Sequence, residues 1–177
     1  IVSTGTGYGN TVFVHNGAKH ATIRDNIITS AYRPFMIGDP SESYSPGYVK
    51  FVNNRTYSTN INGGLRTRTA LDNATWPIWF INNVVVINNA TNEDVGIECW
   101  TANTSILDNY IYATNLKGGF SGVVFGIGEN NIARGNRIFG YSMGIEIGNT
   151  AKGLHIIDGN VITGCKRGIG VTTGGVE

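Results

Sequence analysis

The sequence predicts an all-β fold, a parallel β-solenoid (β-helix) of about seven rungs. Three observations predict it: an asparagine that recurs every 24–29 residues, short β-rich segments that recur with it, and the lack of a helix-period stripe longer than two turns. Neighbouring strands of a meander or sandwich return after about ten residues, which this repeat does not allow. Each repeat is instead expected to wrap once, so that every strand pairs in parallel with its equivalent in the next repeat.

The first repeated element is a turn that ends on asparagine. Six segments (TIRDN, KFVNN, WFINN, SILDN, IARGN and IIDGN) align on Asn26, Asn54, Asn83, Asn109, Asn136 and Asn160. The residue before each asparagine is Asp, Asn or Gly, the types that best tolerate left-handed backbone angles. Apolar residues stand three positions before it, at Ile23, Phe51, Phe80, Ile106, Ala133 and Ile157. We therefore expect stacked side-chain amides along the turn, beside an inward column of apolar side chains.

The second repeated element is a short strand with one buried face. The segments are VFV at 12–14, FMI at 35–37, LRT at 65–67, IEC at 97–99, VVF at 123–125, IEI at 145–147 and IGV at 169–171. Their outer members are mostly apolar and the middle one varies, which is the period-two pattern of a half-buried strand. A glycine directly precedes each of the last five segments. The middle residues are therefore expected to form an outward row.

Length and charge define the general class of protein. With 177 residues, of which 13 are basic and 12 acidic, the chain is expected to form one domain over 1–177 and has no electrostatic footprint for nucleic acid. No apolar run approaches the roughly 20 residues that span a bilayer, so membrane insertion is not expected. Cys99 and Cys165 lack metal or redox spacing, and no metal or cofactor is predicted. The start at Ile1 and the stop at Glu177 in mid-pattern predict a piece of a longer or processed chain.

The stacked asparagine turns and the Gly-Ile-x-Ile strands resemble the right-handed parallel β-helix of pectate-lyase-like proteins, from about Val12 to Val171. The uneven repeat lengths and the long loops rich in Thr, Asn and Gly look most like a bacteriophage tailspike or a related polysaccharide depolymerase. This resemblance implies a single-stranded right-handed coil, a polysaccharide partner, an extracellular or virion-surface location and, as in tailspikes, a homotrimer. It is specific for the fold and does not by itself assign a function.

Loop insertions predict where a working surface lies, because loops on a rigid scaffold carry function. Extra residues lengthen the connections at about 38–48, 68–77, 88–95 and 113–121. These loops flank the strands centred on Arg66, Glu98 and Val124 from both sides. A lateral groove along the outward row of the strands is therefore expected.

Two glutamates in the outward row are the candidate catalytic pair. The row reads Phe13, Met36, Arg66, Glu98, Val124, Glu146 and Gly170. Because neighbouring rungs lie roughly 4.8 Å apart, Glu98 and Glu146 are expected about 9–10 Å apart, close to the roughly 6.5–9.5 Å between the carboxyls of inverting glycosidases. They could act as acid and base, with Arg66 as the orienting group. The alternative is an exposed Arg66–Glu98 ion pair worth at most about 1 kcal/mol and a solvated Glu146.

Further side chains are predicted to bind substrate beside this pair. Arg68 and Asp72 lie at the expected groove edge and could hold an acidic sugar. Trp76, Trp79 and Trp100 offer aromatic faces that suit the flat apolar faces of sugar rings. The alternative for each tryptophan is packing in the core or in a trimer interface.

Two functions remain open from the sequence. The first is a carbohydrate-active enzyme, a glycoside hydrolase-like depolymerase that cleaves a bacterial surface glycan with Glu98 and Glu146. In the lyases that the sequence resembles, carboxylates hold calcium and an arginine abstracts a proton; the aspartate cluster for such a site is missing here, so a lyase is the weaker option. The second function is a non-catalytic binding or structural module of a tailspike, fibre or adhesin, which uses the same groove to recognise glycan or to pack against sister chains.

Overall fold

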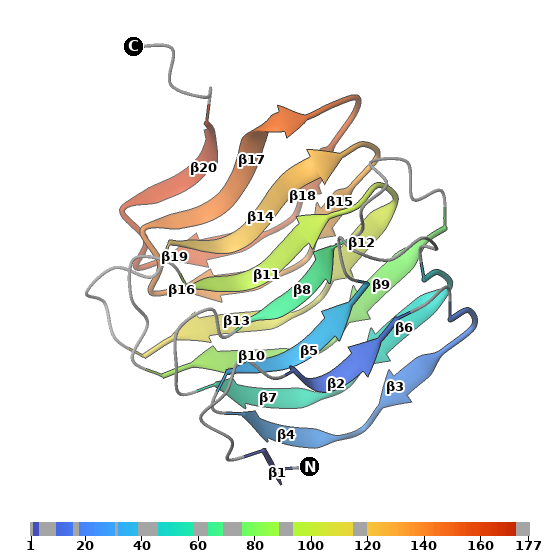
Figure 1. Cartoon of the computed structure of the whole chain (residues 1–177). Helices are drawn as coiled ribbons and strands as arrows, with labels where there is room; N and C mark the ends of the chain where they lie inside the picture. Colours follow the sequence, from blue (N-terminus) through green and yellow to red (C-terminus); the bar gives the residue numbers. More distant parts are fainter. Residues whose placement is uncertain are drawn as a thin grey trace.

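The structure, a computed structural model, describes residues 2–3, 10–15, 18–30, 32–38, 46–58, 64–68, 76–88, 94–114 and 120–172. These residues form twenty β-strands and no helix, and so none of their segments is a helix long and apolar enough to cross a membrane. The strands follow one another as successive turns of a single coil, with β1 and β20 at its opposite ends (Figure 1).

Three sheets run along the coil. The first sheet has seven strands: β1 (Val2–Ser3), β4 (Ile27–Ser30), β7 (Arg55–Ser58), β10 (Val84–Ile87), β13 (Tyr110–Ala113), β16 (Arg137–Phe139) and β19 (Val161–Thr163). The second sheet also has seven: β2 (Asn10–Val14), β5 (Arg33–Ile37), β8 (Leu65–Arg68), β11 (Val95–Trp100), β14 (Ser121–Gly128), β17 (Met143–Ala151) and β20 (Arg167–Val171). The third sheet has six: β3 (Thr22–Arg24), β6 (Val49–Val52), β9 (Ile78–Ile81), β12 (Thr104–Leu107), β15 (Ile132–Arg134) and β18 (Ile156–Asp158).

All strand pairs within the three sheets are parallel. Each strand pairs with the strand three positions further along the chain, so one sequence repeat forms one turn of the coil. The predicted all-β parallel β-helix is therefore confirmed. The third sheet has one strand fewer than the other two, and the coil closes slightly fewer complete turns than the seven rungs predicted.

The six aligned asparagines form a ladder of hydrogen bonds at the turn from the third sheet into the first. In successive rungs the backbone N–H and the side-chain amide of one asparagine both donate to Oδ1 of the next, at 2.8–3.3 Å. The side-chain amide also reaches back: Nδ2 of Asn109 donates to the carbonyl of Phe80 at 2.9 Å. Four members, Asn54, Asn83, Asn109 and Asn136, are at most 1% exposed. The predicted stack of amides is confirmed.

The residue before each ladder asparagine has a left-handed backbone, with φ between 51° and 68° at Asp25, Asn53, Asn82, Asp108, Gly135 and Gly159. Two of these side chains extend the ladder, since Asn82 donates to Asn53 at 2.8 Å and Asn53 to Asp25 at 3.3 Å. At Gly135 a Cβ would lie 2.1 Å from Oδ1 of Asp108. The restriction of this position to Asp, Asn and Gly thus follows from its backbone angle.

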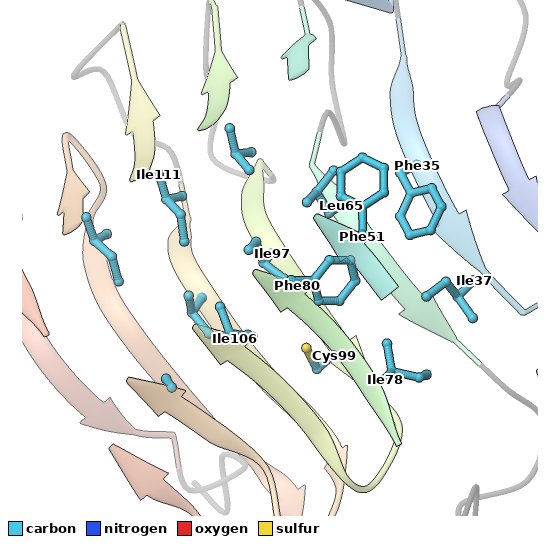
Figure 2. Packing of buried hydrophobic residues seen from close by; sticks show 14 of the residues in the cluster. Phe35, Ile37, Phe51, Leu65, Ile78, Phe80, Ile97, Cys99, Ile106 and Ile111 are labelled. Atoms are coloured by element: carbon cyan, nitrogen blue, oxygen red, sulfur yellow. The ribbon is translucent and has the colours of Figure 1, made fainter. Parts of the chain in front are cut away.

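The core is a stack of inward side chains that fills the interior of the coil. Phe51 lies in register with Phe80, and Phe80 with Ile106. The rings of Phe35 and Phe51 stack with their centroids 4.2 Å apart. Figure 2 shows these side chains, together with Ile97, directed into the same interior, and all five are fully buried. The predicted inward column is therefore part of a continuous core along the coil.

Packing requires glycine at two positions near the start of second-sheet strands, Gly96 of β11 and Gly122 of β14. A Cβ on Gly96 would lie 2.3 Å from Cγ2 of Ile111, and one on Gly122 would lie 2.3 Å from Cγ2 of Ile138. Both distances are far below van der Waals contact. The isoleucines of the first sheet therefore occupy the space that a side chain would need, and glycine allows the chain to turn closely around them into the second sheet.

Replacing Asn109 with Leu is expected to destabilise the fold by about 3 kcal/mol or more, because it removes the acceptor of the buried Asn83 amides and leaves buried carbonyls without a donor. The matched control is Asn88→Leu, at a half-buried turn outside the ladder. Urea unfolding of the two variants measures the difference. Equal losses of unfolding free energy would contradict a structural role for the ladder.

His155, directly before β18, packs its ring against the core. The ring stacks on Phe125 with centroids 5.4 Å apart and an interplanar angle of 13°. Both ring nitrogens are buried, and neither has a hydrogen-bond partner of good geometry among the described residues. Burial lowers the pKa of His155, an effect that the nearby Lys152 carbonyl offsets in part. The folded chain therefore favours the neutral imidazole.

This environment predicts a loss of stability in acid. The unfolded chain binds a proton at His155 near the ordinary pKa of about 6.5, and the folded chain does so only at lower pH. The stability associated with the neutral ring is complete above about pH 6.5 and falls as the pH drops below that value. Thermal unfolding between about pH 8 and pH 5 should show a shallower acid-side decline for His155→Phe, which keeps a flat ring on Phe125 without ring nitrogens. Identical slopes would argue against this role of the imidazole.

Candidate functional site

The predicted outward row exists, in the predicted register, on the second sheet. Strand pairing aligns Phe13 with Met36, Met36 with Arg66, Arg66 with Glu98, Glu98 with Val124, Val124 with Glu146 and Glu146 with Gly170. Their sequence neighbours Phe35, Ile37, Val123 and Phe125 belong to the core cluster. The row therefore lies on the outer face of the sheet. One rung, that of Val124, lies between Glu98 and Glu146.

Glu98 is held by two neighbouring groups. Its Oε2 lies 2.9 Å from Nε of Arg66 on the adjacent strand, and Nε1 of Trp100 donates a hydrogen bond to its Oε1. The two charged side chains are only 14% and 18% exposed, so water screens this ion pair less than it screens a surface pair. The Arg66–Glu98 ion pair is therefore mostly buried, in contrast to the exposed pair that the sequence left as an alternative.

Three arginines influence one another around Glu98. Burial lowers the pKa of Arg66, and the negative charge of Glu98 opposes this shift, while Arg33 and Arg68 add to it. Burial likewise lowers the pKa of Arg33, which is 6% exposed and donates to Sδ of Met36. Glu98 is thus the carboxylate that balances a locally positive part of the outer face. Sequence analysis missed Arg33, because it stands outside the outward row.

Glu146 is buried rather than solvated, with 5% of its surface exposed. Oγ of Ser121 donates to its Oε2 at 2.7 Å, and Oγ1 of Thr172 donates to its Oε1 at 3.0 Å. Within the described part of the chain, no cation lies within ion-pair distance of it. The two glutamates therefore have different surroundings: Glu98 faces a cation and an indole N–H, whereas Glu146 faces two neutral hydroxyl groups.

Both glutamates line one hollow in the outer face of the second sheet, which we call the first cavity. Its volume is about 350 Å³, and its lining includes Glu98, Glu146, Trp100 and Thr172. The lining also contains the apolar side chains of Val95, Phe120 and Val124. The sequence prediction that Glu98, Glu146 and Trp100 share one concave surface therefore agrees with the geometry.

Glycines form part of the wall beside Trp100. A Cβ on Gly126 would lie 2.9 Å from Cε2 of Trp100, and Gly148 in turn lies against the backbone of Gly126. Both glycines line the first cavity together with Trp100. Because no side chain projects from these two positions, the indole packs against backbone and space remains open beside it.

A second cavity of about 470 Å³ adjoins the first. Its lining includes Ser121, Ser142, Met143, Lys166 and Arg167. Phe120, Glu146 and Thr172 line both cavities. The site is therefore a groove of two compartments with Glu146 at their junction.

The remaining predicted binding residues lie elsewhere or are not described. Trp79, on β9 of the third sheet, lies beneath Nζ of Lys50 at 5.2 Å, and Trp76 packs against Tyr48; neither lines the two cavities. Arg68 lies opposite Trp100 in register. Asp72 is outside the described residues, as are most residues of the four predicted loops.

The sequence assigned no site role to Phe120, Ser121 or Thr172, although the predicted groove-flanking loop at 113–121 includes the first two. Ser121 precedes Gly122 at the start of a strand, and Thr172 follows the last strand. The repeat alignment considered only the three central residues of each strand, so it gave these strand-end residues no place in the outward row. Among the described residues, no group of three His, Cys, Asp or Glu side chains is placed to hold a metal ion.

Comparisons with known proteins assign no family to this chain. No family model matches this chain, and no curated protein or solved structure matches it significantly. The protein is thus defined as a parallel β-helix with a two-compartment groove on one outer face. The narrower likeness to pectate-lyase-like proteins and tailspikes rests on the sequence pattern.

Replacing Glu98 with Ala is expected to shift the indole N–H signal of Trp100 in a ¹H–¹⁵N NMR spectrum, because it removes the acceptor of that hydrogen bond. The other two tryptophans, Trp76 and Trp79, have different neighbours, and their signals should keep their positions. Glu129→Ala removes an exposed carboxylate outside both cavities and is the matched control. A spectrum of the Glu98 variant in which no indole signal moves would contradict the described site.

Proposed function

We propose that this protein recognises a polysaccharide in the groove of the second sheet and cleaves it by acid/base hydrolysis. The observation that supports this most directly is that the carboxylates of Glu98 and Glu146 and the indole of Trp100 line one cavity. Sugars present both hydroxyl groups and flat apolar faces, and this lining offers polar acceptors beside an aromatic side chain. The resemblance of the sequence to tailspikes and depolymerases points to a bacterial surface glycan as the substrate.

The two positions suit two roles in an inverting reaction. Arg66 and the Trp100 N–H fix the orientation of the Glu98 carboxylate, which is assigned as the general base. Glu146 lines both cavities and is assigned as the general acid that protonates the oxygen between two bound sugars. Glu98 takes a proton from a water molecule, and the oxygen of that water attacks the anomeric carbon. The glycosidic C–O bond breaks, and Glu146 protonates the oxygen that leaves. Glu98 and Glu146 are two rung steps apart, about 9–10 Å between strand positions, which leaves room for that water.

A second candidate function is recognition without catalysis. Each carboxylate already has partners: Arg66 and Trp100 for Glu98, and two hydroxyls for Glu146. Such contacts also suit a static binding surface of a tailspike, fibre or adhesin module. For both candidate functions we propose a homotrimer at an extracellular or virion-surface location. Light scattering of the purified protein measures its mass and so tests the trimer.

The test is a screen of the purified protein against a panel of bacterial surface polysaccharides. New reducing ends without unsaturated uronate absorbance indicate hydrolysis, unsaturated products indicate a lyase, and binding without either indicates recognition alone. Failure to bind any member of the panel would contradict both candidates.

If hydrolysis is found, Glu98→Gln and Glu146→Gln should each lower the rate by about 10²–10⁴-fold, because an amide cannot transfer the proton. Glycan affinity should stay nearly unchanged in both variants, since Gln keeps the shape of the side chain. Trp100→Ala should weaken binding by removing an aromatic face, and Glu129→Gln is a control outside the cavities. Full activity in both Gln variants would remove the catalytic assignment.

A further inference from the structure

The position of Glu146 divides the groove into two unequal compartments. Glu146, Phe120 and Thr172 line both cavities, so a chain that fills both must pass this carboxyl group. Glu98 and Trp100 lie only on the first side, and Lys166 and Arg167 lie only on the second. If Glu146 protonates a glycosidic oxygen, that oxygen lies at the junction and the two linked sugars occupy one cavity each.

The first cavity offers no free cation to a negatively charged sugar. Among the described residues, its lining contains neither lysine nor arginine. The nearby Arg66 is already paired with Glu98, with 2.9 Å between Nε and Oε2. The indole face of Trp100 carries negative electrostatic potential, which also disfavours an anion. This cavity therefore suits a neutral sugar stacked beside the indole.

The second cavity has the opposite character. Lys166 and Arg167 are adjacent and exposed, and neither forms an ion pair with any residue that the structure describes. Their backbone N–H groups donate to the carbonyls of Tyr141 and Ser142 at 3.3 and 2.9 Å, so the preceding rung holds both positions. A guanidinium beside an ammonium forms charge-assisted hydrogen bonds with carboxylate, sulfate or phosphate groups. The hydroxyls of Ser121 and Ser142 add neutral polar groups to the same lining.

We propose that the second cavity is an anion-recognising subsite and the first a neutral one. The substrate is then a heteropolysaccharide in which a sugar bearing a carboxylate, sulfate or phosphate ester is linked to an uncharged sugar. This inference rests on the proposed function and deepens it, because it names the substrate class and the residues that select it. Lys166 and Arg167 are the specificity-determining residues.

The placement of the two carboxylates also sets the direction of cleavage. Water activated by Glu98 attacks from the side of the first cavity, so the attacked anomeric carbon belongs to the neutral sugar held there. The oxygen that Glu146 protonates leaves with the sugar in the second cavity. Hydrolysis therefore creates a reducing end on the neutral sugar and a non-reducing end on the anionic one.

The experiment measures binding and product structure with the same polysaccharide panel, which includes neutral and anionic polymers. In a Glu146→Gln background, which removes turnover, Arg167→Gln and Lys166→Gln are each expected to weaken binding of the anionic ligand by about tenfold or more. Lys152→Gln, an exposed lysine outside both cavities, is the matched control and should bind as the background does. Circular dichroism melting curves establish that the variants are folded. Mass spectrometry of products from the unmodified protein identifies the sugar at each new end.

The outcomes separate the inference from the proposed function. Selective binding of anionic heteropolysaccharides, lost in the Arg167 and Lys166 variants, with neutral sugars at the new reducing ends, supports the inference. Binding or cleavage of a neutral polymer, affinity unchanged by both substitutions, or an anionic sugar at the new reducing end would overturn it while leaving polysaccharide recognition intact. Absence of binding to every polymer in the panel would overturn both.

Discussion

The hydrogen bonds of the asparagine ladder are the interaction on which the rest of the structure depends. Each rung makes a sharp turn with buried backbone N–H and carbonyl groups, and buried polar groups without partners are costly. The side chain of one asparagine accepts from the backbone and the side chain of its neighbour and donates to a carbonyl of the preceding rung. Because each amide bonds to the equivalent amide one repeat away, the ladder permits one register between rungs.

That register positions the candidate site. The turn at Asn83 and Asn109 sets the pairing of the strands that follow it, and a slip of one residue would exchange the inner and outer faces. With the observed register, Arg66 meets Glu98 directly, and Glu146 lies one rung beyond Val124 on the same face. A regular scaffold therefore presents charged side chains at fixed intervals, without any of them contributing to the core.

The chemical character of the groove comes from departures from that regularity. Glycines at 126 and 148 leave space beside Trp100, where side chains in a perfect repeat would fill the outer face. Ser121 and Thr172 bring hydroxyls to the carboxyl group of Glu146, which is only 5% exposed. The same outer face thus holds one carboxylate balanced by a cation and another held by neutral donors. The proposed roles follow from position, because Glu146 lines both compartments and Glu98 lines only the first.

The sequence by itself determined the coil, the asparagine turns, the inward column and the outward row, because these depend on short-range periodicity and on left-handed positions that few residue types accept. It also placed Glu98, Glu146 and Trp100 on one concave surface, since parallel pairing of equivalent strands converts a repeat into spatial neighbours. Only the tertiary structure decided that Arg33 is buried near Glu98 and that hydroxyls from strand ends contact Glu146. Those contacts join residues at non-equivalent positions of different rungs, and the repeat period carries no information about such positions.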